Sequence, residues 1–214
     1  SGAGLEEFLG DALTSADRVI DSSEGIALLE GGHHHHHESE EPAEEEHHHE
    51  HDPHIWLSPA NAILMAENIC QGLTQRYPQH SQVLQDNLAV LTKELEALDA
   101  YGQSTLQDLS CRDLITFHDG FSYFADAFDL HIIRAVEEES GSEASAKELI
   151  QLIEEAEHHQ LPAIFTEKSG SVSAAGIISR ETGCGSFPLD MAMAGNSYFA
   201  AMYHNINTIK EALG

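Results

Sequence analysis

The sequence predicts an α/β fold in which helices cover a parallel sheet. Beyond residue 111, short runs rich in β-branched and aromatic residues alternate with longer runs of helical periodicity, as in strands joined by crossover helices. Hydrophobic residues make up 41% of the 214 residues, which is enough for one sizeable core or two small ones. In such a fold, function is expected at the loops that leave the strand ends.

The N-terminal half is predicted to be helical around one polar segment. Apolar residues at three- and four-residue spacings indicate an amphipathic helix over residues 4–20, and a short apolar piece follows at 25–29. Ser58 supplies an N-cap for a helix that ends before Pro78. The next helix has no Gly or Pro over residues 81–101, so it is expected to reach about 30 Å at 1.5 Å per residue, long enough to bridge two lobes.

Strands and helices are expected to alternate in the second half. The strands are predicted at residues 114–117, 132–136, 163–166 and 186–189, and the helices at residues 121–128, 144–159, 172–181 and 197–213. Polar side chains gather in the loops at residues 116–121, 166–169 and 187–190. Two of these loops place a candidate metal ligand at the end of an apolar run.

The charge balance narrows the range of partners. Nine Lys and Arg residues against 37 Asp and Glu residues give a formal net charge of -28, which repels phosphate backbones and anionic lipid surfaces. Nucleic acid is therefore excluded as a partner, and cations are favoured. No apolar stretch approaches the ~18 residues that a membrane span requires.

The cysteines leave the redox compartment open. Cys70, Cys111 and Cys184 are too few and too scattered for a CxxC metal site or a disulfide scaffold. A single disulfide between Cys111 and Cys184, which precede neighbouring predicted strands, is one alternative in an oxidising compartment.

A segment rich in histidine and carboxylate occupies residues 33–51. It has no apolar periodicity, so ordering it costs backbone entropy with no burial to offset it, and it is predicted to be a mobile loop. An expression tag is a poor explanation, because tags lie at chain termini. Such a loop would bind zinc weakly and raise its concentration near a cleft. Two other roles stay open: the loop could sense the saturation of the protein with metal, or it could accept metal from a chaperone. The accessory candidates are His33, His34, His35, His36, His37, His47, His48, His49 and His51.

Three further residues are candidate ligands of a fixed metal site. His54 follows a proline and precedes Ile-Trp-Leu, although it is also the last member of the His-rich run. His118 lies at a predicted strand end between two phenylalanines, where a buried histidine bonded to a carbonyl is the alternative. Asp190 ends the last strand, and its alternative role is a helix N-cap. Two neutral imidazoles and a carboxylate suit Zn²⁺, and Mn²⁺ or Fe²⁺ less well.

Three motifs of the sequence resemble those of one protein family. They occur in the same order as in that family, and the resemblance extends along essentially the whole chain. They are Asp-Pro-His-Ile-Trp-Leu-Ser-Pro at residues 52–59, Thr-Phe-His-Asp-Gly-Phe-Ser-Tyr-Phe at residues 116–124 and Asn-Ser-Tyr-Phe-Ala-Ala-Met at residues 196–202. The family is that of the periplasmic or surface solute-binding proteins of zinc and manganese ABC importers, known as cluster A-I. An internal His/Asp/Glu loop just before the Asp-Pro-His motif is typical of its zinc-specific members.

The resemblance implies two α/β lobes with parallel sheets, joined by one long rigid helix at residues 81–109, with the metal between the lobes. Residues 1–80 would form a partial first lobe that carries the His-rich loop at residues 33–51, and residues 110–214 the second lobe. His54 is expected to bind from the first lobe, and His118 and Asp190 from the second. Manganese members usually carry Glu at the position of His118, so His118 favours zinc.

The resemblance also implies that the first lobe is incomplete. In the family, this lobe begins upstream of the segment Gly-Ala-Gly-Leu-Glu found here at residues 2–6, with further strands and another His ligand. The chain is therefore expected to be N-terminally truncated, with the fourth zinc position left to water, a loop histidine or a neighbouring chain. Exposed sheet edges would favour self-association.

The expected function is capture of Zn²⁺ outside the cytoplasm, in the periplasm or at the cell surface, and delivery to an ABC permease without catalysis. Affinity should fall below about pH 6.5, the ordinary histidine pKa, because binding needs neutral imidazoles. Three alternatives stay open: a manganese or iron carrier, a zinc-dependent hydrolase, and a passive buffer in which the loop provides all tight binding. Against the hydrolase, no second carboxylate is placed as a general base.

Overall fold

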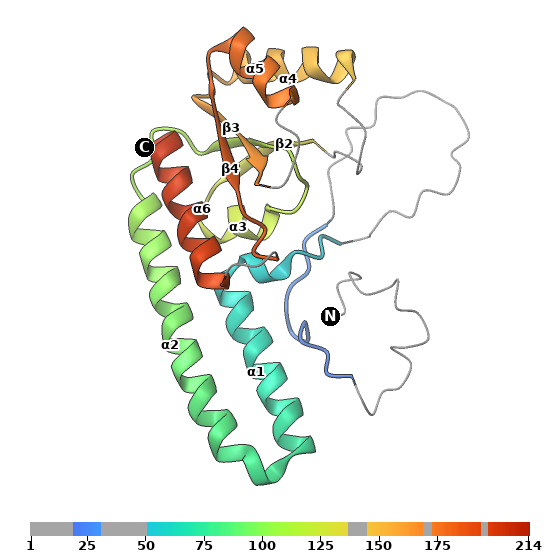
Figure 1. Ribbon diagram of the computed structural model, residues 1–214, viewed down its shortest axis with the longest axis vertical. Coiled ribbons are helices and arrows are strands. Elements are labelled where there is room, and N and C mark those ends of the chain that lie inside the picture. Colours follow the sequence, from blue (N-terminus) through green and yellow to red (C-terminus); the bar gives the residue numbers. More distant parts are fainter. Residues whose placement is uncertain (1–18, 31–50, 137–144, 169–172, 194–196) are drawn as a thin grey trace, which may run out of the picture.

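The computed structural model describes residues 19–30, 51–136, 145–168, 173–193 and 197–214 (Figure 1). Residues 1–18, which hold most of the helix expected over residues 4–20, lie outside these ranges. So does the expected His-rich loop, except for His51.

A four-stranded sheet forms the centre of the structure, in the order β2-β1-β3-β4. Its strands are β1 (Asp113–Thr116), β2 (His131–Ala135), β3 (Ala163–Glu167) and β4 (Gly185–Leu189). Every pairing between them is parallel, with Thr116 opposite Phe165 and Glu167 opposite Leu189. The parallel sheet is confirmed, and each predicted strand lies within about one residue of its observed ends.

Helices cover both faces of this sheet, as expected for an α/β fold. They are α3 (Ser122–Ala127), α4 (Ala146–His158), α5 (Ser173–Thr182) and α6 (Tyr198–Leu213). Leu114 of β1 packs in one core with residues of α2, α3 and α6, whereas its neighbour Ile115 packs in a second core with residues of α4 and α5. Because successive side chains of a strand point to opposite faces, a strand covered on both sides is apolar throughout. This double burial explains the apolar runs of the two central strands, β1 and β3.

Two long helices, α1 (Pro59–Arg76) and α2 (Ser81–Leu106), precede the sheet and lie side by side, extending away from it (Figure 1). Ser58 Oγ accepts the backbone N–H of Asn61 at 3.4 Å, so the predicted N-cap of α1 is confirmed. The helix expected over residues 81–109 ends at Leu106. The lobe boundaries after residues 80 and 109 stay predictions.

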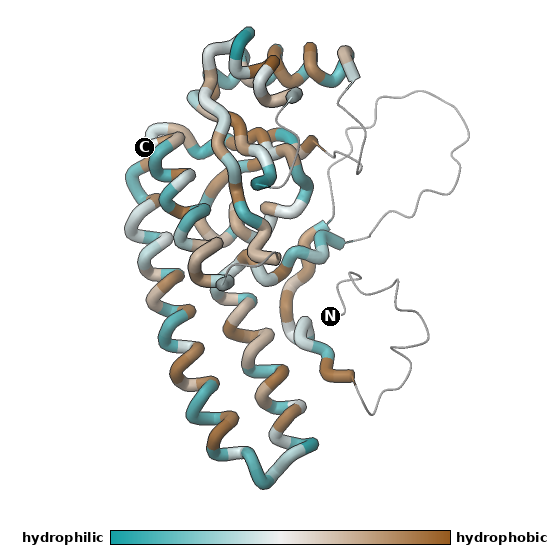
Figure 2. Tube along the Cα trace, viewed as in Figure 1, coloured by the Kyte–Doolittle hydropathy of each residue, from teal (hydrophilic) through white to brown (hydrophobic). Residues whose placement is uncertain are grey.

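Only the half of α2 next to the sheet is anchored in the core. Its buried residues begin at Leu95 and end at Leu106, whereas Val83 is 59% exposed and Val90 is 61% exposed. Apolar residues lie along the far part of both helices (Figure 2). Despite these apolar side chains, no helix among the described residues combines the length and hydropathy needed to cross a membrane.

The three cysteines are unpaired in the structure. Thr182 donates a hydrogen bond from Oγ1 to the Sγ atom of Cys184 at 3.0 Å, while the Sγ atom of Cys111 lies 3.8 Å from the Asp113 carbonyl oxygen. The disulfide between Cys111 and Cys184, one alternative from the sequence, is therefore not formed.

Candidate metal centre

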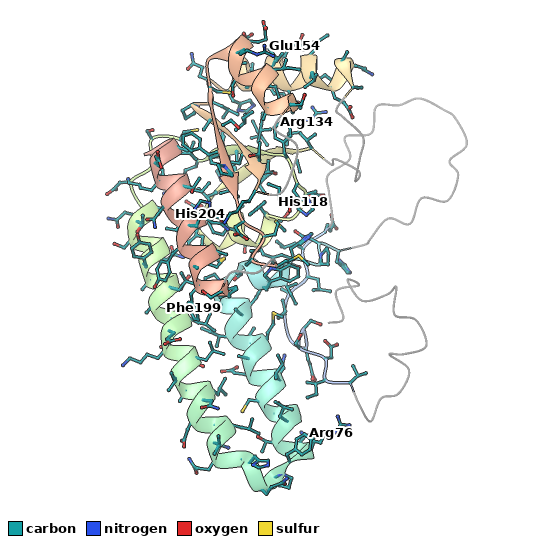
Figure 3. The ribbon with its side chains drawn as sticks, in the orientation of Figure 1. Arg76, His118, Arg134, Glu154, Phe199 and His204 are labelled. Carbon is teal, nitrogen blue, oxygen red and sulfur yellow. The ribbon has the colours of Figure 1, made fainter. Side chains whose placement is uncertain are left out.

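The candidate residues come from the carboxyl ends of three strands and from the segment before α1. His118 follows β1, Glu167 ends β3 and Asp190 follows β4. Because β1, β3 and β4 are adjacent and parallel, their carboxyl ends meet at one edge of the sheet. Figure 3 shows His118 at this edge, beside the segment that leads into α1.

Buried neighbours hold the segment that carries His54. Ile55, in a short 3-10 helix (η3, Ile55–Leu57), is fully buried. Trp56 donates a hydrogen bond from Nε1 to the Met191 carbonyl at 2.9 Å, and the Tyr198 hydroxyl donates to the Trp56 carbonyl at 2.9 Å. Burial raises the pKa of Tyr198, which keeps this donor protonated. These bonds tie the segment before α1 to the region of β4 and α6.

Asp52 orients the imidazole of His54. Its Oδ1 atom lies 2.7 Å from His54 Nδ1 and accepts the His54 backbone N–H at 2.8 Å. When Nδ1 donates to this carboxylate, Nε2 carries the lone pair and is available to a metal ion. His54 is thus a fixed ligand candidate rather than the end of the His-rich run.

His54 and His118 face each other through their Nε2 atoms, which are 3.4 Å apart. The two ring centroids are 5.1 Å apart, and the rings are nearly perpendicular at 81°. Two nitrogen ligands of a tetrahedral zinc ion, each bound at 2.0–2.1 Å, are separated by about 3.3–3.4 Å. The observed separation therefore fits one zinc ion shared by both Nε2 atoms.

Burial and charge favour the neutral form of His118. The pKa of His118 is lowered from its ordinary value of 6.5, first by burial and then by the charge of His54, while Glu167, Asp119 and Asp52 act in the opposite direction. The Oε2 atom of Glu167 lies 3.9 Å from His118 Nδ1, so both rings direct Nδ1 toward a carboxylate and Nε2 toward each other. Such carboxylate partners are typical of metal-binding histidines.

Gly120 leaves the space in which the two rings meet. A Cβ atom added at Gly120 would lie 2.7 Å from His118 Cδ2, 2.7 Å from Met191 Cε and 2.9 Å from His54 Cε1. Real side chains do not approach each other so closely, so any other residue would displace the rings. This glycine is required by the close packing of the two imidazole rings and Met191.

Asp190 is held at its strand end by other partners. Asn205 of α6 accepts the Asp190 backbone N–H and donates to its carbonyl, both at 2.8 Å. The Asp190 Oδ1 atom accepts the Ala192 N–H at 2.9 Å, and Oδ2 lies 3.2 Å from Lys168 Nζ. These partners of Asp190 are Asn205, Ala192 and Lys168, and neither histidine is among them.

The structure thus brings together two of the three predicted ligands, His54 and His118. Over the described ranges, no group of three or more His, Cys, Asp or Glu side chains is already arranged to hold a metal ion. Of the accessory histidines, His51 pairs with Glu30 in an antiparallel bridge, and those at residues 33–37 and 47–49 lie outside the described residues.

Sequence reasoning missed the roles of three charged residues, Asp52, Glu167 and Lys168. They lie in the Asp-Pro-His motif and in the loop at residues 166–169, both of which stand out in the sequence. Their residue types alone do not identify them, because most charged residues of a protein lie on its surface and have no such role. Asp52 reaches His54 because it lies two residues earlier in the chain. The order of the strands places Glu167 beside His118 and Lys168 beside Asp190.

Comparisons with known proteins agree on one family. The family model described as zinc-uptake complex component A periplasmic (ZnuA) matches residues 1–212. A protein of Treponema pallidum (strain Nichols) named as metal-binding is 30% identical over 219 residues, which cover 99% of this chain and 69% of the relative. The zinc-binding lipoprotein AdcA of Streptococcus pneumoniae serotype 4 is 29% identical over 170 residues, which cover 76% of this chain and 34% of AdcA.

Solved structures share the fold. The crystal structure of ZnuA matches with a TM-score of 0.80 and 31% identity, over 99% of this chain and 76% of that chain. A zinc-bound ZnuA deletion mutant matches with a TM-score of 0.80 and 31% identity, over 100% of this chain and 76% of that chain. Since the family model extends over nearly all of the sequence, the chain belongs to the family of the zinc-uptake complex component A.

Proposed function

We propose that this chain captures Zn²⁺ outside the cytoplasm with His54 and His118 and delivers it to the permease of an ABC importer. The observation that carries the proposal is the 3.4 Å separation of the two Nε2 atoms. Asp52 fixes one ring and Glu167 lies beside the Nδ1 atom of the other, so little reorganisation is needed when the ion binds. Membership of a zinc-uptake family supports the same cargo.

Asp190 is the proposed third ligand. Its carboxylate follows β4 at the edge of the sheet where His118 follows β1, and the next residue, Met191, reaches the space beside Gly120 where the rings meet. Asp190 Oδ2 already attracts a cation, because Lys168 Nζ lies 3.2 Å away. Binding through all three side chains requires Asp190 to exchange this ammonium for zinc.

Zinc is favoured over the manganese or iron alternatives by the donor set. Two imidazole nitrogens suit Zn²⁺ better than Mn²⁺, which prefers oxygen ligands, and zinc also exceeds Mn²⁺ and Fe²⁺ in intrinsic affinity for such sites. Absence of catalysis is part of the proposal. Asp52 and Glu167 lie beside the Nδ1 atoms of the two histidines, where they orient the rings and do not serve as general bases for a metal-bound water.

The His-rich loop is proposed as an accessory that raises the zinc concentration at this site. Glu30 and His51 are bridged, and the Asp52 N–H donates to the Leu29 carbonyl at 3.0 Å. Both ends of the loop are therefore anchored next to Asp52 and His54, where weakly held ions would be released close to the fixed ligands.

Calorimetric titration with zinc tests the proposal. Residues 31–50 are replaced by a short Gly-Ser turn, which the paired ends at Glu30 and His51 allow, and zinc is added to this chain and to its His118→Ala variant. We expect the parent to bind one zinc ion tightly and the His118→Ala variant to lose this binding. His80→Ala, which changes an exposed histidine, is the control and should retain it. Equal binding by the His118→Ala variant would contradict the proposed site, and loss of all tight binding with the loop would favour the passive buffer.

Self-association of the chain is also proposed, and the exposed apolar residues along α1 and α2 support it. The test is the solution mass over a range of protein concentrations. A monomer at every concentration would contradict it.

A further inference from the structure

Lys168 stands beside the proposed third ligand. It follows β3 directly, and its backbone N–H donates to the Leu189 carbonyl at 2.8 Å, which fixes its Cα atom next to the end of β4. Its Nζ atom lies 3.2 Å from Asp190 Oδ2. The Lys168 side chain is 51% exposed, whereas that of Asp190 is 8% exposed. A solvent-accessible ammonium thus reaches inward to a nearly buried carboxylate.

This ion pair differs from the others that Arg or Lys forms among the described residues. Arg112 pairs with Asp129 and Arg134 with Glu155, and those carboxylates are 82% and 35% exposed. The carboxylate of Asp190 is the nearly buried one, and a nearly buried charge without a counter-charge is costly. With nine Lys and Arg residues against 37 acidic ones, a cation at this position is notable.

We propose that Lys168 is a tethered competitor of the metal ion, a conclusion that rests on the proposed function. In the metal-free protein, its ammonium occupies Oδ2 of Asp190 and keeps the carboxylate balanced. Zn²⁺ displaces the ammonium into the solvent when it binds, and the ammonium returns to Asp190 when the ion leaves. Lys168 therefore weakens equilibrium binding and speeds release, which suits a protein that must hand its cargo to a permease.

The chemistry of lysine fits this exchange. A lysine ammonium is a compact charge on a flexible stem and binds through one point, whereas an arginine would hold the carboxylate through two parallel hydrogen bonds. Because half of the Lys168 side chain is exposed, the ammonium reaches water by rotation of the stem without disturbing the core. The Oδ1 atom of Asp190 keeps its bond from the Ala192 N–H throughout, so the carboxylate stays oriented.

Zinc dissociation kinetics test the inference. The loop-replaced chain and its Lys168→Gln variant are loaded with zinc and mixed with an excess of chelator, and the fluorescence of Trp56, whose ring lies 5.3 Å from that of His54, follows release. We expect Lys168→Gln to bind zinc about 2- to 5-fold more tightly and to release it more slowly by a similar factor. Lys93→Gln, at an exposed lysine of α2, is the matched control and should leave both values unchanged.

A double-mutant cycle separates competition from indirect effects. In an Asp190→Asn background, Lys168→Gln should change neither affinity nor release rate, because the competition requires the carboxylate. If the parent binds zinc through His118 but Lys168→Gln binds it equally or more weakly, the role of Lys168 is overturned and the proposed function stands. A parent without His118-dependent binding would overturn the proposed function and this inference together.

Discussion

Asp52 and His54 form the closest polar contact of the candidate site, with 2.7 Å between Asp52 Oδ1 and His54 Nδ1. The same oxygen accepts the His54 backbone N–H, so the carboxylate fixes the ring and the chain that carries it. This arrangement presents Nε2 of His54 to Nε2 of His118.

Asp52→Ala should therefore weaken zinc binding by about 10- to 100-fold, which is the usual effect of removing a carboxylate behind a metal-bound histidine. Asp52→Asn, which keeps an oxygen acceptor, should weaken it less. Calorimetry on the loop-replaced chain measures both, and Asp86→Ala, at an exposed carboxylate of α2, is the control. Parent-like affinity in Asp52→Ala would mean that the His54 ring needs no such partner.

Gly120→Ala should remove tight zinc binding because its Cβ atom would lie less than 3.0 Å from both histidine rings and from Met191. Gly176→Ala is a matched control within α5, where an added Cβ meets no atom within 4 Å. Since Ala is about 0.5–1 kcal/mol more favourable than Gly inside a helix, Gly176→Ala should slightly stabilise the fold and leave zinc binding unchanged. Urea unfolding and zinc titration of both variants distinguish a local clash from general loss of structure.

The fold was largely predictable because its strands and helices depend on local patterns. The central strands β1 and β3 are buried on both faces, and Ser58 and Pro59 mark the start of α1 at the predicted place. The linking helix was expected to reach residue 109, whereas α2 ends at Leu106. Gly102 lies within α2 and does not end it. A Cβ atom there would lie 2.2 Å from Phe128 Cε1, so this glycine serves the packing of α2 against Phe128, which directly follows α3.

The site was less predictable because its contacts depend on the order of the strands. His54 and His118 are far apart in the chain, and the family resemblance, not their spacing, indicated that they meet. The pairing of Asp190 with Lys168 follows from the adjacency of β3 and β4, which no local pattern contains. Residue type gave the candidate donors, but the competing ammonium was visible only in three dimensions.

The lowered pKa of His118 predicts how zinc affinity depends on pH. Burial and the charge of His54 lower it below 6.5, so this ring stays neutral to a lower pH than an ordinary histidine. With an ordinary imidazole at this position, zinc affinity would begin to fall near pH 6.5. Because His118 stays neutral to lower pH, its part of this loss should occur at lower pH. Zinc titrations between about pH 5 and pH 8 measure the midpoint. A midpoint above 6.5 would contradict the prediction.

The same shift affects the stability of the metal-free protein. The unfolded chain takes up a proton at His118 near pH 6.5, whereas the folded chain takes it up only at lower pH. The stability that the neutral His118 contributes to the fold is therefore complete above pH 6.5. It is lost as the pH falls through the pKa of His118 in the folded chain. The free energy of unfolding in urea should thus fall more between pH 7 and pH 5 in the parent than in His118→Ala. An equal fall in both chains would show that His118 does not carry this dependence.

The two halves of α2 should respond differently to truncation of their side chains. Leu98 is fully buried, and Leu98→Ala should lower the free energy of unfolding by about 2–5 kcal/mol. Val90 is 61% exposed, and Val90→Ala should change it by no more than about 0.5 kcal/mol. Urea unfolding measures both. A large loss from Val90→Ala would show that another part of the chain, or a second copy, covers this part of the helix.

Replacement of His118 by glutamate should change the metal preference. A carboxylate oxygen is a harder donor than an imidazole nitrogen, so His118→Glu exchanges a ligand that suits zinc for one that suits manganese. We expect this variant to bind zinc more weakly than the parent and to show a smaller ratio of zinc to manganese affinity, whereas His118→Ala should lose tight binding of both ions. Competition between the two metals, followed through Trp56, measures the ratio. An unchanged ratio in His118→Glu would mean that residue 118 does not set the choice of metal, and selectivity would then have to come from His54 and Asp190.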